Sequence, residues 1–376
     1  MAKTISLSDY PLWKNAREKN TLFRMTFELT KRCTNNCIHC YNNLDENDPD
    51  AVKRELSTDE VKDIVDQAVD LGLLWITLTG GEIFLRNDFL DLYVYMKKKG
   101  LLVSLFSNAT LITRTDTDVL KKYPPRDIEI SVYGIDKISY AKVARKDNFL
   151  KFKTGLDLLK QAGIPFGLKS TVMKANFKQL KEITQFCEIH ANDPKKRFRF
   201  DPFLVLRTDK NRIRNKEIIR QRLSAEEIIR LEKQYPERVD ALCKQYTQIN
   251  EKKQNMDSPE IIFKCGAGIN SCSIDAHGSF KLCSLLVNES CTYNLKTGTF
   301  SEAWNTFTPE IRSLTSSKKA YHTQCSICKL RDFCTWCPAI VDLEDDVLDE
   351  KNDSFCDTAH KRYKYCFNLN QNKNKN

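Results

Sequence analysis

Apolar runs of strand length alternate with amphipathic helical patterns from residue 22 to about residue 205. The runs are rich in β-branched and aromatic residues, and the segments between them repeat apolar residues at helical spacing. Ser57 and Glu60 form a capping box at the start of the first predicted helix. Gly100 and Gly163 stand where helices should stop. The predicted strands are Phe23–Leu29, Trp75–Thr79, Leu102–Phe106, Ile128–Val132, Phe166–Val172 and Phe198–Phe203, and the predicted helices lie near 58–71, 88–99, 115–122, 149–162 and 177–190.

This alternation predicts an α/β fold with a parallel sheet built from βαβ units. Six βα units are fewer than the eight that close a TIM barrel, so we expect a partial (βα)6 TIM-like barrel over residues 22–206. Its open side must be covered by another part of the chain.

The pattern changes after the barrel. Charged helical patterns at Glu226–Gln234 and Arg238–Asn250 predict a bridge, and most of the fifteen cysteines follow it. A segment with little apolar surface to bury can fold around metal, because binding energy then becomes folding energy. The predicted segments outside the barrel are an N-terminal extension (1–21), the helical bridge (207–260), a Cys-rich domain (261–366) and a disordered tail (367–376).

Composition and charge narrow the function classes. The chain shows no apolar run long enough to span a membrane and no signal-peptide core, so we expect a cytoplasmic protein whose thiols stay reduced. Many cysteines then indicate metal sites and not disulfides. The net charge is +10, with basic clusters at 195–199 and 207–222. Basic surfaces can recruit acidic peptides or nucleic acid, but the simpler interpretation as solvated faces is favoured.

Cys33, Cys37 and Cys40 form a C-x-x-x-C-x-x-C loop directly after the first predicted strand. Three thiolates on a four-iron cluster leave one iron without a protein ligand, and a small molecule can chelate there. The loop lies at the carboxyl end of its strand, where α/β folds bind ligands. The alternatives are a reactive dithiol or a zinc site, but structural zinc sites usually take four ligands from paired motifs.

Gly80-Gly81-Glu82 follows the second predicted strand. The two glycines remove side chains where a ligand must lie against the backbone, and Glu82 can accept hydrogen bonds from an amino group. Alone, the same three residues are also typical of a tight strand-to-helix turn.

The C-terminal cysteines have metal-ligand spacing. Four of them follow one another as C-x-x-C-x-x-x-x-x-C-x-x-C, which would also suit a zinc knuckle. Three more surround a predicted strand–turn–strand at Gly278, and one comes later. Together they could hold two four-iron clusters or two zinc ions. These eight are Cys265, Cys272, Cys283, Cys325, Cys328, Cys334, Cys337 and Cys356, whereas Cys187, Cys243, Cys291 and Cys366 have no motif role.

The cysteine loop followed by Gly80-Gly81-Glu82 closely resembles the radical S-adenosylmethionine (SAM) superfamily. The resemblance implies that the open iron chelates the amino and carboxylate groups of SAM. One electron then splits the sulfonium, giving methionine and a 5′-deoxyadenosyl radical that abstracts a substrate hydrogen. Ile83 stands where the family commonly has proline, which should alter the turn and not the chemistry.

The same resemblance implies a set of SAM contacts. Gly80, Gly81 and Glu82 would hold the methionine amino group. His39 would pack near adenine, although a loop histidine that simply packs is an equal alternative. The residues in ribose- or carboxylate-contacting places are Ser107, Asn108 and Ser131, of which Ser131 could be only part of a strand.

The C-terminal cysteines resemble the SPASM extension of peptide-modifying radical SAM enzymes. The resemblance implies two auxiliary clusters. If Cys272 ligates the first, that cluster is closed; if not, an iron is open to substrate. The spacing from Cys334 to Cys337 is one residue shorter than the common form. The implied ligands are Cys265, Cys283 and Cys337 with Cys272 as a possible fourth, and Cys325, Cys328, Cys334 and Cys356 for the second cluster.

The resemblance implies a peptide maturase with three [4Fe-4S] clusters and SAM as cofactors. It would form thioether or carbon–carbon crosslinks, or related oxidations, in a ribosomally made peptide. We expect a separate leader-binding protein and an electron donor such as flavodoxin or ferredoxin as partners, and neither a membrane nor nucleic acid. Three alternatives remain: tetrapyrrole side-chain chemistry, sulfatase-type formylglycine formation, for which Ser284 replaces the usual acidic base, and a non-catalytic zinc- or cluster-bearing binding module.

Overall fold

The computed structural model describes residues 18–192, 198–251 and 260–373. Most of the N-terminal extension (1–17), most of the first basic cluster (195–197) and the last three residues therefore lie outside the described residues. Within the described ranges, every helix is too short or too polar to cross a membrane.

All six predicted strands are present and form one continuous parallel run. The complete sheet has nine strands in the order β11-β10-β9-β1-β4-β5-β6-β7-β8. Each strand from β1 to β8 pairs in parallel with the next along this run, which is the arrangement expected for βαβ units. The strands are β1 (Arg24–Thr30), β4 (Trp75–Gly80), β5 (Leu102–Ser107), β6 (Asp127–Ser131), β7 (Gly167–Thr171) and β8 (Arg199–Asp201).

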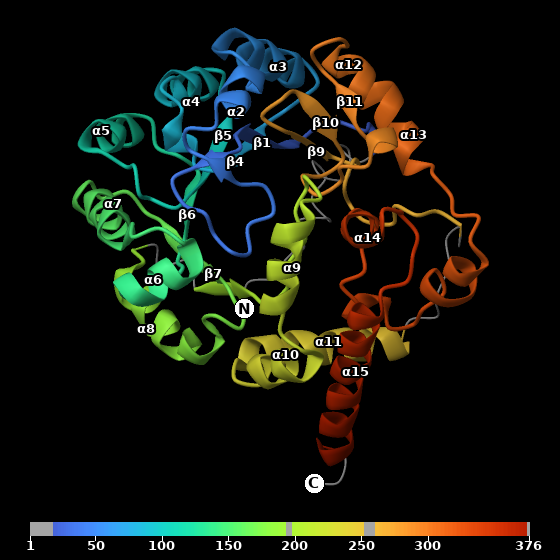
Figure 1. The fold of residues 1–376 in the computed structure, drawn as a ribbon. Coiled ribbons are helices and arrows are strands. Elements are labelled where there is room, and N and C mark those ends of the chain that lie inside the picture. Colours follow the sequence, from blue (N-terminus) through green and yellow to red (C-terminus); the bar gives the residue numbers. More distant parts are fainter. Residues whose placement is uncertain (1–17, 193–197, 252–259, 374–376) are drawn as a thin grey trace, which may run out of the picture.

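The predicted helices lie on the outer side of this curved sheet, which makes a partial barrel (Figure 1). The capping box of Ser57 and Glu60 is formed. Sequence analysis missed α6 (Lys137–Ala144), whose buried face includes Ser139 and Ala144, so its apolar periodicity is weak. The helices that match the predictions are α3 (Thr58–Asp70), α4 (Phe89–Lys98), α5 (Arg114–Lys122), α7 (Phe149–Gln161) and α8 (Leu180–His190), and the short α2 (Pro49–Arg54) precedes them.

Strand β1 shows how alternation builds the core. Met25, Phe27 and Leu29 are buried in the main hydrophobic cluster, beneath the helices. The alternate residue Glu28 is buried as well, but on the opposite face of the strand, among polar groups. One face of β1 therefore supplies the barrel core and the other supplies chemistry.

The Cys-rich region continues the barrel sheet. Strand β9 (Ser271–Ile274) pairs in parallel with β1, and β10 (Ser279–Lys281) returns antiparallel to β9 through the predicted turn. Gly278 takes a φ of +87° in that turn, which favours glycine. This region thus fastens to the N-terminal strand of the barrel. Its further elements are β11 (Tyr293–Asn294), α12 (Phe300–Glu302), α13 (Thr308–Arg312), α14 (Pro338–Asp345) and α15 (Asp353–Lys373).

The bridge and the C-terminus differ in part from prediction. The bridge contains the two expected helices as α10 (Ala225–Glu232) and α11 (Pro236–Glu251), together with α9 (Arg212–Gln221). The disordered tail expected from residue 367 is wrong as far as Lys373, because α15 continues to that residue. Tertiary packing on α10 and α11 supports a helix that its Asn- and Lys-rich sequence does not predict.

A buried ion pair fastens α15 to the bridge. Arg362 bonds through two nitrogens to Glu232, and its Nη1 also donates to the Phe333 carbonyl at 3.0 Å. Both side chains are at most 10% exposed. Breaking such a pair leaves an uncompensated buried charge.

We expect Arg362→Met to weaken the docking of α15 by about 3–5 kcal/mol, because Glu232 then stays charged and buried. Hydrogen–deuterium exchange of the α15 amides measures this loss. The double variant Glu232→Leu/Arg362→Met should recover most of the protection. The exposed pair Arg145–Glu217 is the control, and breaking it should cost no more than about 1 kcal/mol. Equal effects from both pairs would contradict the assignment.

Candidate functional site

The cysteine loop leaves the carboxyl end of β1 and lies against α6. Strand β2 (Arg32–Cys33) pairs with the short β3 (Leu44–Asp45) and closes the base of the loop. Backbone amides of Asn36 and Ile38 donate to carbonyls at the end of α6, at 2.9 and 3.0 Å. The loop is therefore held along its backbone, independently of what its thiols bind.

The three thiols face one another. Cys33 and Cys37 are buried and Cys40 is half-buried. Burial raises the pKa of Cys33 well above its ordinary value, and the nearby charges of Cys37 and Cys40 contribute to the rise. Burial likewise raises the pKa of Cys37, and a hydrogen bond with Tyr133 partly offsets this rise. Three close thiols that resist ionisation in a buried site need a cationic partner before they can become thiolates.

Glu82 connects the glycine motif to the cysteine loop. It is fully buried and accepts hydrogen bonds from the Ser107 hydroxyl at 2.8 Å and the Asn108 amide at 2.7 Å. The Asn108 side chain in turn approaches the Cys33 sulfur at 3.5 Å. Burial raises the pKa of Glu82 to about 7, although these hydrogen bonds oppose the rise. The structure thus brings four predicted site residues into one network.

Gly80 and Gly81 pack against the strand that leads into the cysteine loop. A Cβ on Gly80 would lie 2.1 Å from the Thr30 carbonyl oxygen, and one on Gly81 would lie 2.1 Å from that of Arg32. The amides of Gly81 and Glu82 donate to the same two carbonyls, at 2.7 and 2.9 Å. The glycines therefore set the distance between the two halves of the site.

His39 and Ser131 are placed less tightly. His39 is half-buried beside Tyr133, with ring centroids 5.8 Å apart, and its Nδ1 atom is buried without a hydrogen-bond partner. Burial lowers the pKa of His39 to about 4, so the ring is neutral near pH 7. An unsatisfied ring nitrogen beside the loop fits a ligand that supplies the missing partner. Ser131 ends β6 at the same edge of the sheet and is half-buried.

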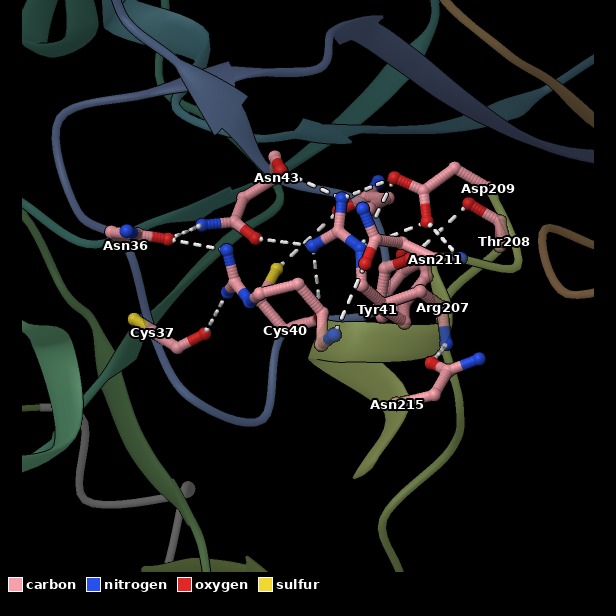
Figure 2. Close-up of polar contacts among 12 residues, drawn as sticks. Asn36, Cys37, Cys40, Tyr41, Asn43, Arg207, Thr208, Asp209, Asn211 and Asn215 are labelled. Atoms are coloured by element: carbon pink, nitrogen blue, oxygen red, sulfur yellow. Dashed lines mark hydrogen bonds and ion pairs between the residues drawn. The ribbon is translucent and has the colours of Figure 1, made fainter. Parts of the chain in front are cut away.

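Sequence analysis missed two arginines that hold the cysteine loop, Arg207 and Arg214, of which Figure 2 labels Arg207. Arg207 donates to the Cys40 carbonyl oxygen at 3.3 Å and to Asn43 at 2.8 Å. Arg214 donates to the Cys37 carbonyl oxygen at 3.0 Å. Both belong to the basic cluster that was predicted to be a solvated face, and for Arg207, which is buried, that prediction is wrong. No local signal distinguishes these arginines from their exposed neighbours.

Cys265, Cys283 and Cys337 come together in the Cys-rich region. Burial raises the pKa of Cys283 to about 11, and the charges of Cys337 and Cys265 add to the rise. The charge of Cys265 also raises the pKa of Cys337. Three of the cysteines predicted for the first auxiliary cluster are therefore neighbours.

Cys272 does not join this group. It pairs with Met25 across β1 and β9 and lies in the main hydrophobic core, 3% exposed. Burial alone raises its pKa, with no contribution from another cysteine. The structure therefore places Cys272, the possible fourth ligand, in the core and apart from the other three cysteines. Strand alternation points the next residue, Ser273, to the other face, where it bonds to Ser284 at 2.8 Å.

The remaining four cysteines line a cavity of about 240 Å³. The charges of Cys356, Cys334 and Cys328 all act on Cys325, and its burial raises its pKa to about 11. Cys356 comes from α15, so helix docking completes the cavity. Four thiols that line one cavity suit a bound inorganic group. The other lining residues are Gln324, Arg331, Trp336, Lys351 and His360.

The thiol groups supply the donor atoms of metal sites. In the described part of the chain, no three His, Cys, Asp or Glu side chains converge on one point that a metal ion could occupy. Groups of three and four cysteines supply the thiolates that structural zinc and iron–sulfur clusters both take.

The motif-free cysteines are structural. Cys187, Cys291 and Cys366 are buried, and Cys243 packs beside Cys366 between α11 and α15. Buried free cysteine behaves as a small apolar residue.

A buried polar surface lies between the cysteine loop and the first auxiliary group. The Tyr41 hydroxyl donates to Glu28 at 3.2 Å. Burial raises the pKa of Tyr41 well above its ordinary value, and the charges of Glu28, Cys40 and Cys283 add to the rise. Tyr41 thus lies within electrostatic reach of both thiol groups, which border one region of the interior.

Comparison with known proteins identifies the barrel. Residues 27–187 match the family model of the Radical SAM superfamily. The AdoMet-dependent heme synthase of Nitratidesulfovibrio vulgaris is 32% identical over 165 residues, which make up 44% of each chain. The subtilosin biosynthesis protein AlbA of Bacillus subtilis is 30% identical over 162 residues, 43% of this chain and 35% of AlbA. The chain therefore spans less than half the length of these curated relatives.

The fold as a whole also matches solved structures. Streptococcus suis SuiB, bound to its precursor peptide SuiA, superimposes with a TM-score of 0.64 at 18% sequence identity. The match covers 95% of this chain and 84% of SuiB. Because the sequence identity is low, this likeness shows the fold alone, including the Cys-rich region beyond the barrel.

Cys272 and Cys283 provide a direct test of the thiol grouping. Cys283→Ala should remove about four of about twelve iron atoms per reconstituted chain, because a four-iron cluster loses one of its ligands. Cys272→Ala should retain all of them, because this side chain only fills the core. Iron and sulfide quantitation measures both. Loss of the same iron from the two variants would show that Cys272 is a ligand.

Proposed function

We propose, from the match of residues 27–187 to the family model of the Radical SAM superfamily, that this protein is a radical SAM maturase that modifies a ribosomally made peptide. The observation that carries the proposal is the gathering of ten cysteines into three groups, one at the barrel edge and two in the Cys-rich region. A single radical SAM site accounts for only the first group.

The cysteine loop and the glycine motif would hold the first cluster and SAM. Cys33, Cys37 and Cys40 would supply three thiolates, and the cluster's electron with SAM supplies a 5′-deoxyadenosyl radical when both are bound. Glu82 is aimed at the loop by its bonds to Ser107 and Asn108, and it would accept from the methionine amino group. Neutral His39, with its unsatisfied Nδ1, would face adenine.

Two auxiliary clusters would occupy the other thiol groups. Cys325, Cys328, Cys334 and Cys356 would close the second cluster in its cavity. With Cys272 in the core, the first would keep only three thiolates and one open iron. An open iron would bind a substrate donor, or the cluster would accept the electron left on the product, and Tyr41 is a residue within electrostatic reach of Cys283 in this group.

The peptide substrate is supported by the relatives. AlbA is named for bacteriocin biosynthesis, and the structure of SuiB holds a precursor peptide. A separate leader-binding protein and a flavodoxin or ferredoxin remain predicted partners.

Tetrapyrrole chemistry is the second candidate, because a heme synthase is 32% identical over the barrel. Binding of an iron porphyrin would change its Soret absorbance, and binding of a peptide would not. Sulfatase-type oxidation has less support, because Ser284, in the place of the acidic base, is paired with Ser273.

The reconstituted, dithionite-reduced protein should convert SAM to 5′-deoxyadenosine, because Cys33, Cys37 and Cys40 would hold a reducible cluster with one iron free for SAM. Cys37→Ala should abolish this product, because it removes a ligand of the first cluster, while Cys187→Ala should not, because Cys187 only packs in the core. Liquid chromatography measures the product. A non-catalytic binding module would make none.

Peptides encoded next to this protein should lose two hydrogens per turnover, as a crosslink requires, and mass spectrometry detects the change. An unchanged peptide mass with an altered porphyrin mass would favour the second candidate.

Glu82 predicts a pH dependence for SAM binding. Burial raises its pKa to about 7, so the carboxyl gains its charge as pH rises through 7. A charged carboxylate accepts a hydrogen bond about twice as strongly as a neutral group. The affinity for SAM should therefore be several-fold tighter at pH 8 than at pH 6, as measured by anaerobic calorimetry. Glu82→Gln should bind SAM more weakly and lose the difference in affinity between pH 8 and pH 6. The ionisable groups of SAM titrate in the same way with both proteins, so they do not account for this loss. An unchanged difference in the variant would exclude Glu82 as the acceptor.

A further inference from the structure

A buried arginine in the segment after β8 holds the cysteine loop through hydrogen bonds. Arg207 is 3% exposed, and its guanidinium contacts three oxygens of the loop. Nη1 donates to the Cys40 carbonyl at 3.3 Å and to Asn43 Oδ1 at 2.8 Å, and Nη2 donates to the Asn43 carbonyl at 2.9 Å. Thr208 adds its amide, which donates to the Tyr41 carbonyl at 2.8 Å. Residues that lie far from the cysteine loop in the sequence therefore hold it through hydrogen bonds (Figure 2).

A second arginine donates hydrogen bonds to the middle of the loop. Arg214, in α9, donates to Asn36 Oδ1 at 2.7 Å and to the Cys37 carbonyl at 3.0 Å. The Asn43 side chain also donates to Asn36 Oδ1, at 3.4 Å, which joins the two arginine contacts. The carbonyls of two of the three loop cysteines are therefore bonded to guanidinium groups.

The two cations face a site that gathers negative charge. A cluster with three thiolates is anionic, and it becomes more so when it accepts an electron. The counter-charge of Arg207 is Asp209, whose side chain is 42% exposed and bonds on the side away from the thiols. Solvent screens an exposed carboxylate more than a buried guanidinium, so a net positive field remains at the loop.

The same segment reaches the auxiliary region. Lys210 pairs with Asp346 at 2.7 Å and lies 3.5 Å from the buried Asp342. Arg222 pairs with Glu344. These acidic residues belong to α14 or its end, and α14 begins directly after Cys337. Residues 207–222, which we name the basic strut, therefore connect the first cysteine loop to a cysteine of the first auxiliary group.

We propose that Arg207 is a positioning residue for the first cluster, which shapes its cysteine loop and favours its reduced form. This inference rests on the proposed function. The buried guanidinium fixes the loop through directional bonds, which lysine cannot reproduce, and its charge stabilises the reduced cluster, which lysine can. Substitution of Arg207 by lysine therefore separates the effect of the directional hydrogen bonds on the loop from the effect of the positive charge on the cluster.

The test compares Arg207→Gln and Arg207→Lys with the parent, in the reconstituted full chain. Arg220→Gln is the control, because it removes the same charge from an exposed position on the same segment. The signal to follow is the paramagnetic resonance of the reduced cluster that changes when SAM is added, which distinguishes it from auxiliary clusters. Its midpoint potential and its rate of iron loss to a chelator are measured without turnover.

Arg207→Gln should shift the midpoint potential to a more negative value and release this cluster's iron about 10-fold faster. Arg207→Lys should restore the potential but keep the faster release. Arg220→Gln should match the parent in both. A purely structural arginine would change the release rate and leave the potential in place, and a potential for Arg207→Gln equal to that of the parent would overturn the proposal.

Two further outcomes keep the test decisive. If Arg207→Gln does not fold, as judged by circular dichroism, Arg214→Gln takes its place, because its half-buried charge lies beside Cys37 and should shift the potential the same way. No response of the parent's signal to SAM would refute the proposed function. A SAM-responsive parent with no shift in either variant would refute the role of the arginines alone.

Discussion

The pairing of β1 with a strand on each side is the constraint on which the rest of the structure depends. On one side β4 brings Gly80, Gly81 and Glu82 against the start of the cysteine loop. On the other side β9 brings the Cys-rich region into the same sheet. Because β1 is central and ends at the loop, the first thiol group, its glycine partner and the auxiliary region are positioned by one strand.

The register of that pairing decides which side chains can take part in chemistry. Cys272 lies opposite Met25, and its side chain points into the hydrophobic core beneath the helices. The side chain of Ser273 and the polar side chains of β1 point to the opposite face of the sheet. A shift of one residue would exchange them, because side chains alternate along a strand. The proposal that the first auxiliary cluster keeps an open iron is therefore a consequence of strand register and not of cysteine count.

Features of the fold that depend on short-range sequence patterns were predicted from the sequence. Six strands, five helices and the capping box followed from periodicity and end signals. The family resemblance assigned Glu82, Ser107 and Asn108 to the SAM site, and the structure joins these three residues by hydrogen bonds that were not predicted. Register and long-range contacts were beyond such patterns. Arg207 meets Cys40 across a separation of 167 residues, and its basic surroundings look like a solvated face. The helix at 367–373 continues the part of α15 that packs on α10 and α11, and the polar sequence of these residues does not predict that continuation.

The central claim is that Cys33, Cys37 and Cys40 hold a four-iron cluster whose fourth iron binds SAM. The most direct measurement is electron–nuclear double resonance on the reduced, reconstituted protein with SAM labelled by ¹⁵N at its amino group. Our account predicts a ¹⁵N coupling strong enough for direct coordination to iron, lost in Cys37→Ala. A cluster signal that shows no such coupling at saturating SAM would contradict it.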